Sequence, residues 1–169
     1  MKRKIFFAAI GALMCAWASA QNTMVVNSEK IFKALPAYNT AVTQLDNMSK
    51  DYQKKVDDAF AAVQQMYNDY QGQRQYLSDY DRKSREDAII SREKEVTKAQ
   101  QDFFGPDGEL MKKRIEMIKP IQDKVFKFIT DYAIASGFGI VIDQSANATL
   151  LYFAPTLDKT QDIINQLNK

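Results

Sequence analysis

The sequence contains no histidine, and its single cysteine, Cys15, lies within the first twenty of the 169 residues. Ser-His-Asp and Cys-His catalytic sites and ordinary zinc or transition-metal sites depend on imidazole or sulfur groups. We therefore expect no metal and no cofactor in the chain beyond residue 20. Carboxylate pairs, a Ser-Lys dyad and an all-oxygen calcium site stay open, although no acidic loop has the alternating Asp/Asn spacing of a calcium loop.

The first twenty residues have the three parts of a secretory signal. Basic residues at 2–4 precede an apolar run at 5–17, and the small residues 18–20 follow. An apolar run of about 13 residues is short of the roughly 20 that a membrane-spanning helix needs. We expect cleavage after Ala20 and export of the mature chain, with an uncleaved anchor as the alternative. Met14 is too bulky for the position before a lipidated cysteine, which argues against a lipid anchor.

The charge of the mature chain is close to zero. Residues 1–20 hold three of the 23 basic residues and none of the 21 acidic ones, so removing them leaves 20 against 21 and a net charge of −1. Binding to nucleic acid or to anionic membranes rests largely on clustered Lys and Arg. We therefore expect no nucleic-acid partner and, at most, weak peripheral contact with a membrane or with lipopolysaccharide.

A long polar stretch at residues 37–136 has helical spacing. In its first part, apolar or aromatic residues recur every three or four positions, which predicts one continuous stripe along a helix. The stripe consists of Leu45, Met48, Tyr52, Val56, Ala59, Val63, Met66 and Tyr70. Gly72 weakens this helix and Ser78 is a good N-cap for a second one, so we place the tip of a helical hairpin at 72–81.

The second arm of the predicted hairpin is interrupted at Gly105-Pro106-Asp107-Gly108. Two glycines around Pro-Asp favour a turn or a sharp kink over continuous helix. An exposed irregularity and a hinge are both open interpretations of this break. Beyond it, residues 110–132 carry a denser apolar face, which predicts a helix that bends at Pro120 and returns into a small body.

Short apolar segments near both ends of the chain predict three strands, at 24–26, 140–142 and 149–153. Asn27-Ser28 can cap a short helix, and Asp158 or Thr160 can cap a last one. The predicted fold is α+β and mostly α, with a body at 21–36 and 120–169 and a hairpin arm at 37–119. The expected body core or oligomer interface is Val25, Val26, Ile140, Val141, Ile142, Leu150, Leu151 and Tyr152. So small a body buries little surface alone, which favours oligomerisation.

Several segments carry a family resemblance through their order and spacing. They are Val25-Val26-Asn27-Ser28-Glu29-Lys30-Ile31-Phe32, Leu35-Pro36-Ala37-Tyr38, Lys119-Pro120-Ile121, Gly137-Phe138-Gly139-Ile140-Val141-Ile142-Asp143, Leu150-Leu151-Tyr152 and Leu157-Asp158-Lys159-Thr160. Together they resemble the Skp/OmpH family (outer membrane protein H-like) of periplasmic chaperones over nearly all of the mature chain. The near-neutral charge and the break at 105–108 depart from the strongly basic chains and more regular arms of the best-known members.

The resemblance implies a homotrimer in which strands of three subunits form a small β-barrel body. Three helical hairpins then extend around a central cavity. In this family, the cavity holds unfolded outer-membrane proteins in the periplasm without ATP. We therefore expect unfolded outer-membrane proteins and two further copies of this chain as its partners.

Aromatic and methionine side chains on the arms are candidates for client binding. Tyrosine offers rigid amphipathic area and methionine a flexible, polarizable side chain, and both suit weak contact with many unfolded chains. The candidates on the arm surface are Tyr52, Phe60, Met66, Tyr67, Tyr70 and Tyr76. Alternatively, these side chains pack the two arms together. Phe60, Tyr67 and Tyr76 lie off the main stripe and are the better candidates.

Two other functional classes remain open beside the holding chaperone. A non-catalytic envelope scaffold or coiled-coil adaptor would dock its hairpin on one specific folded partner. An enzyme would need a converging acid-base set. The adjacent pairs Asp57-Asp58 and Glu86-Asp87 diverge by about 100° on a helix and do not converge. We therefore expect no catalytic residues.

Overall fold

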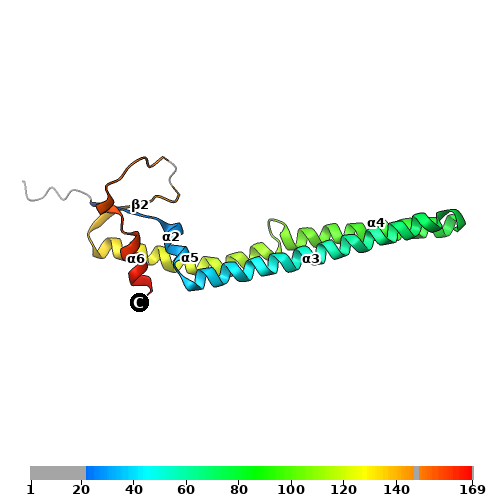
Figure 1. Ribbon diagram of the computed structural model, residues 1–169, viewed down its shortest axis with the longest axis horizontal. Helices are drawn as coiled ribbons and strands as arrows, with labels where there is room; N and C mark the ends of the chain where they lie inside the picture. Colours follow the sequence, from blue (N-terminus) through cyan, green and yellow to red (C-terminus); the bar gives the residue numbers. More distant parts are fainter. Residues whose placement is uncertain (1–21, 147–148, 169) are drawn as a thin grey trace, which may run out of the picture. The chain divides into compact units, whose positions relative to one another are not determined.

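The computed structural model describes residues 22–146 and 149–168, and the predicted export signal at 1–20 lies outside them. The element order is β1 (Asn22–Val26), α2 (Ser28–Lys33), α3 (Pro36–Gln73), η2 (Arg74–Tyr76), α4 (Asp79–Phe104), α5 (Glu109–Ala135), β2 (Phe138–Asp143), η3 (Pro155–Leu157) and α6 (Thr160–Leu167). The predicted α+β, mostly helical fold with a long hairpin is confirmed (Figure 1). None of the described helices combines the length and apolar character needed to cross a bilayer.

The described chain separates into two compact units. One spans Ala37–Gln122 and contains the hairpin, and the other contains the residues before Ala37 and after Gln122. We call them the hairpin unit and the strand unit. In the hairpin unit, α3 lies alongside α4 and the first part of α5 (Figure 1). With 38 residues, α3 has a length of about 57 Å at the usual helical rise.

A narrow apolar seam joins the arms of the hairpin. The seam cluster consists of Val63 and Tyr70 from α3 with Ile89 and Val96 from α4, and Ala59 and Leu77 pack against it. The predicted stripe on α3 therefore faces the opposite arm, as its spacing requires. Met66 is the exception, because 36% of its surface is exposed.

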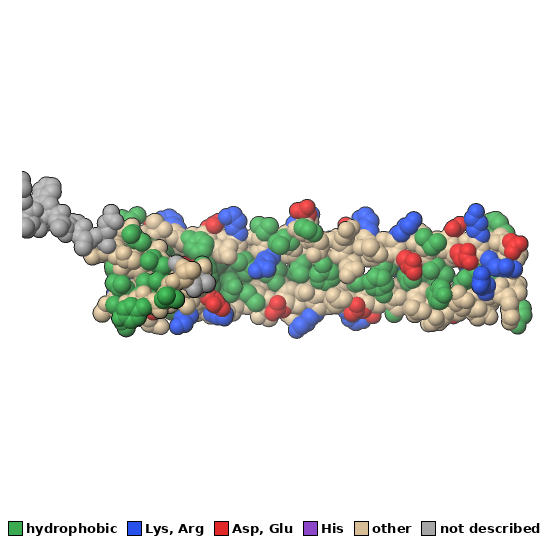
Figure 2. All heavy atoms as spheres, turned by 90° about the horizontal axis from the view of Figure 1, so that it is seen from above, with side chains coloured by type: hydrophobic (Ala, Val, Ile, Leu, Met, Phe, Trp, Pro, Cys, Tyr) green, Lys and Arg blue, Asp and Glu red, His purple; other side chains and the backbone are tan. Residues whose placement is uncertain are grey.

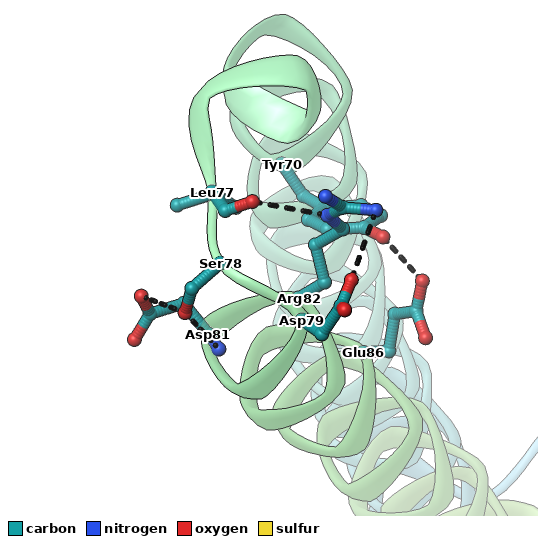
Figure 3. Close-up of polar contacts among 7 residues, drawn as sticks. All are labelled: Tyr70, Leu77, Ser78, Asp79, Asp81, Arg82 and Glu86. Atoms are coloured by element: carbon teal, nitrogen blue, oxygen red, sulfur yellow. Dashed lines mark hydrogen bonds and ion pairs between the residues drawn. The ribbon is translucent and has the colours of Figure 1, made fainter.

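The tip of the hairpin forms where the sequence predicted it. Ser78 caps α4: its Oγ accepts a hydrogen bond from the Asp81 N–H at 3.1 Å and donates one to the Asp81 carboxylate at 2.6 Å (Figure 3). Arg82 donates through Nε to the Leu77 carbonyl at 3.1 Å and pairs with Asp79 at 3.4 Å. These contacts satisfy backbone groups that a sharp reversal leaves without helical partners.

The predicted break at 105–108 is also present. Helix α4 ends at Phe104 and α5 begins at Glu109, and the connecting turn forms a visible loop between them (Figure 1). The Gly108 N–H donates to the Gly105 carbonyl at 2.9 Å, so the turn is closed by its own backbone. Beyond it, α5 continues through Pro120 without interruption to Ala135.

The strand unit is built on β1 and β2, which pair in parallel. Met24 lies opposite Val141, and Val26 lies opposite Asp143. The side chains of Met24, Val25 and Val26 are at most 1% exposed, and this core also contains Ile31 of α2 and Ile163 of α6, both fully buried. Both ends of the chain therefore contribute to one small core.

Polar contacts fix the start of α2. Asn27 caps this helix by accepting from the Lys30 N–H at 2.9 Å, as expected. The Ser28 hydroxyl donates to Asp143 at 2.5 Å, and Ser145 donates to the same carboxylate. Burial raises the pKa of Asp143, but these hydrogen bonds and those of the Ser28 and Ser145 N–H groups outweigh burial and lower the pKa below its ordinary 3.8. The stabilisation by this carboxylate is therefore lost as the pH falls through the lowered pKa.

The expectation that Asp158 or Thr160 is the N-cap of α6 is wrong, because the N-cap is Lys159, which makes no side-chain capping hydrogen bond. Asp158 and Thr160 instead anchor the start of the helix through other contacts. Asp158 accepts a hydrogen bond from the Thr160 N–H at 2.9 Å. The Thr160 hydroxyl instead accepts from the Asn27 N–H at 2.9 Å, although the two residues are 133 positions apart. Thr160 therefore holds the start of α6 against the start of α2.

The prediction of a third strand at 149–153 is wrong. These residues carry no strand pairing in the described structure. The free edge of β1 is occupied by the segment after them, because the Lys159 N–H donates to the Val25 carbonyl at 2.9 Å and Val25 forms a bridge with Asp158.

The residues expected in the body core therefore divide into two groups. Val25 and Val26 are buried within the chain, whereas Leu151 is 95% exposed and Tyr152 81% exposed. Ile140 and Val141 of β2 are 42% and 39% exposed, and Ile142 and Leu150 are partly buried. Within a single chain, Leu151 and Tyr152 are not core residues, because the strand that would have carried them inward is absent.

Replacing Gly137 and Gly72 with alanine, one at a time, should change the stability of the protein in opposite directions. Gly137 follows α5 with a φ of 74°, a left-handed conformation that costs a side-chain-bearing residue about 1 kcal/mol, so Gly137→Ala should destabilise the fold by that amount. Gly72 lies within α3 with open space around it, so Gly72→Ala should stabilise the hairpin by about 0.5 kcal/mol. Urea unfolding at matched protein concentration measures both changes, and shifts of the same sign would contradict this assignment.

Candidate functional site

The surface of the hairpin is the candidate functional site. Among the predicted client-binding residues, Phe60 is 42% exposed, Tyr67 46%, Tyr76 81% and Met66 36%. All four lie in the first arm or in the turn that follows it. The structure therefore leaves these four side chains accessible in a single chain.

Tyr70 does not lie on the arm surface, and that part of the expectation is wrong. Only 4% of its surface is exposed, because its ring belongs to the seam with Ile89 of the opposite arm. Its hydroxyl donates a hydrogen bond to the Glu86 carboxylate (Figure 3). This bond raises the pKa of Tyr70, burial adds to the rise, and Arg74 opposes it. Tyr70 thus remains a protonated donor between the arms.

Tyr52 is partly buried and is engaged by the opposite arm as well. Its ring stacks on Phe103 with centroids 4.4 Å apart and an interplanar angle of 4°, and it meets the edge of Phe104 at 6.4 Å. Its hydroxyl donates to Glu109 at 2.9 Å. This hydrogen bond is the main cause of the raised pKa of Tyr52. The packing alternative therefore describes Tyr52 and Tyr70 better than surface exposure does.

The exposed side chains flank the seam and have polar neighbours. Phe60 borders an open hollow whose lining includes Val63, Glu93 and Thr97. Met66 borders another hollow, lined by Asp69, Arg85, Ala88 and Ile89. Hydrophobic side chains along the hairpin are interspersed with basic and acidic ones (Figure 2). The hairpin thus offers small apolar areas within a well-hydrated surface.

Sequence reasoning missed other exposed apolar side chains of the hairpin unit. Ile90 is 47% exposed, Met111 41% and Ile115 54%. Ile89 and Ile90 are adjacent on α4, and consecutive helical residues point about 100° apart. Only Ile89 reaches the seam. The rule that neighbouring positions diverge could have identified Ile90 as a surface residue.

Charged groups on the hairpin mainly support the helix that carries them. Lys54 pairs with Asp58, Lys98 with Asp102 and Lys113 with Glu116, each within one helix and at 2.6 to 2.7 Å. Exposed pairs of this kind contribute little to stability, because water and salt screen the attraction between the charges. Within residues 22–146 and 149–168, no three acidic side chains come together as metal ligands would.

Comparison with known proteins identifies the family. The family described as Outer membrane protein (OmpH-like) matches residues 22–167. This chain belongs to the OmpH-like family. It is 29% identical over 170 residues to Chaperone protein Skp from Yersinia enterocolitica, with 99% of both chains covered. The resemblance to the Skp/OmpH family that the sequence segments indicated is therefore confirmed.

A solved structure supports the same fold assignment. The chain is similar to a crystal structure from Caulobacter crescentus that is described as an outer membrane chaperone (OmpH-like), with a TM-score of 0.71. The match covers 89% of this chain and 85% of the other at 9% sequence identity. The two chains therefore share a fold although most of their side chains differ. The roles of surface residues in this chain therefore follow from their own contacts and exposure.

Replacing a seam tyrosine and a surface tyrosine with alanine should affect thermal stability differently. Tyr70→Ala removes a buried ring and leaves Glu86 without its donor, so the thermal midpoint should fall by roughly 5–10 °C. Tyr76→Ala removes a ring that is 81% exposed and should change the midpoint by less than about 2 °C. Thermal unfolding followed by circular dichroism measures both, and equal losses would refute the division into seam and surface residues.

Proposed function

We propose that this OmpH-like protein is a holding chaperone that keeps unfolded outer-membrane proteins from aggregating in the periplasm, without ATP. The observation that carries the proposal is the divided surface of the hairpin. Its seam is buried, while Phe60, Tyr67 and Tyr76 remain exposed among charged side chains. The Yersinia and Caulobacter relatives are described as chaperones, and this supports the same class for this chain.

Weak and distributed contacts suit such a task. An unfolded client has no fixed shape, so it is best held by side chains that tolerate many partners. One aromatic contact is worth on the order of 1 kcal/mol, and several in parallel retain a client through their combined effect. Release of the client then needs no ATP, because each contact breaks easily. Folding also buries the apolar surface of the client that the chaperone binds.

We infer that three copies assemble through a body at 21–36 and 120–169, and that the arms at 37–119 surround a client cavity. The exposure of Leu151 and Tyr152 supports this arrangement, because large apolar side chains exposed side by side commonly mark an interface. Ile140 and Val141 add apolar area on β2. Cleavage of a signal after Ala20 would deliver the mature chain to the periplasm.

A scaffold that docks on one folded partner is the second candidate, and the regular seam of the hairpin favours it. The scattered positions of the exposed aromatic residues favour the chaperone, because a single folded partner would call for one contiguous patch. Light scattering distinguishes the two. A chaperone suppresses the aggregation of several unrelated unfolded β-barrel proteins, and a scaffold suppresses none.

Changing Phe60, Tyr67 and Tyr76 together to serine should weaken client capture about tenfold, because three exposed aromatic contacts are lost. The measurement is the concentration of chaperone that half-suppresses aggregation of an outer-membrane β-barrel protein diluted from urea.

The matched control changes three exposed polar residues of the same arm, Asp51, Gln71 and Gln75, to serine. It introduces the same number of serines but removes no apolar contact, so capture should stay as in the wild type. Equal capture by both triple variants, each with native circular dichroism, would contradict the assignment of these aromatic residues.

Leu151→Asp should lower the assembled mass from three copies towards one, because the substitution places a charge in the proposed interface. Multi-angle light scattering after size exclusion gives the mass. Thr156→Asp, at an exposed position nearby in η3, is the control and should leave the mass unchanged. A wild-type monomer, or a Leu151→Asp variant of full mass, would refute the proposed interface.

A further inference from the structure

The break between α4 and α5 is a compact turn. A side chain at Gly105 would place its Cβ 2.5 Å from the Gln101 carbonyl oxygen, and one at Gly108 would lie 2.8 Å from the Phe103 carbonyl oxygen. Both distances are too short for a real contact. Neither glycine has a positive φ, so the close backbone approach, and not a left-handed conformation, requires glycine here.

One side chain of α3 contacts both sides of this turn. The ring of Tyr52 stacks on Phe103, in the last turn of α4, and meets the edge of Phe104. The hydroxyl of the same Tyr52 donates to Glu109, the first residue of α5, at 2.9 Å. Tyr52 therefore joins the end of one helix to the start of the next across the break.

A cation covers the aromatic part of this contact. The Lys55 ammonium lies 5.5 Å from the centroid of the Tyr52 ring and 5.9 Å from that of Phe103. Both distances are within the range of a cation–π interaction. Two residues of α3 thus hold the stack, and Glu109 is joined to it by the tyrosine hydroxyl.

We propose that Tyr52 is a clasp that keeps the α4–α5 break closed and makes the hairpin stiff at this point. The turn has a short backbone hydrogen bond of its own, but the helices on either side lack a continuous hydrogen-bond ladder across it. A joint of this kind opens locally unless something spans it. The hydrophobic ring holds the α4 side, and the polar hydroxyl holds the α5 side.

The clasp concerns the mechanics of the arm and does not depend on what the arm binds. In this proposal Tyr52 has a positioning role. It does not have the client-binding role that was expected from its being a tyrosine. Since Tyr52 controls both halves, losing its ring should free the turn more than losing its hydroxyl alone. The two variants Tyr52→Ala and Tyr52→Phe separate these contributions.

Amide hydrogen exchange of the full chain without client tests the clasp. Three N–H groups report on the break: Gly105 donates to Gln101, Gly108 to Gly105 and Lys112 to Gly108, at 2.8 to 3.1 Å. In Tyr52→Ala, exchange of these amides should be about three- to tenfold faster, since opening becomes easier when a packed aromatic contact is lost. Tyr52→Phe and Glu109→Ala should each give a smaller increase.

An amide at the tip is the internal reference. The Arg82 N–H donates to the Ser78 carbonyl at 2.9 Å, far along the hairpin from the break, and its exchange should not change. Tyr80→Ala, which removes a tyrosine that is 82% exposed, is the matched control and should leave the break amides as in the wild type. Unchanged exchange at the break in Tyr52→Ala would overturn the proposal, and so would an equal increase at Arg82. Wild-type exchange in both Tyr52→Phe and Glu109→Ala would overturn the role of the hydroxyl.

Discussion

A pair of helices can bury only one stripe of each partner, and this limit governs the hairpin of the protein. Val63, Tyr70, Ile89 and Val96 occupy the stripe that is available between α3 and α4, so apolar side chains off this stripe, among them Phe60, Tyr67 and Ile90, stay exposed to water. In a globular domain, packing of the elements around one hydrophobic core would cover many such residues. Here their exposure follows from the architecture, and the proposed chaperone function makes use of it.

The same limit separates two roles for tyrosine. Tyr70 directs its ring into the seam, and Tyr52 stacks its ring on Phe103. Both hydroxyls donate to carboxylates of the opposite arm, so each tyrosine joins the arms through both apolar and polar contact. Tyr67 and Tyr76 lie outside the seam and keep their rings exposed. Residue type alone does not distinguish these roles, because the amphipathic ring suits either environment.

The hairpin could be predicted from the sequence because its determinants are local. Three-and-four spacing located the seam, Ser78 located the start of α4, and the Gly-Pro-Asp-Gly segment located the break. The spacing also placed Tyr52 and Tyr70 on the seam stripe, and it proved a better guide to their positions than their residue type. The partners of Tyr52 could not be predicted, because Phe103 and Glu109 reach it only through the register of the two arms.

The strand unit was harder to predict because its contacts join distant parts of the chain. The apolar runs identified β1 and β2, but nothing local determines which segment pairs with the free edge of β1. The backbone at Asp158 and Lys159 takes that place, and this is why the apolar run at 150–153 forms no strand within the chain. The parallel β1–β2 pairing also has a kinetic consequence. Val26 is paired with Asp143, so the first strand to be synthesised waits for its neighbour until most of the polypeptide exists, a delay of roughly 10 s at typical elongation rates. During that interval the hairpin, whose contacts are nearer in sequence, can already form, and β1 is left as an unpaired apolar segment on a nascent chain.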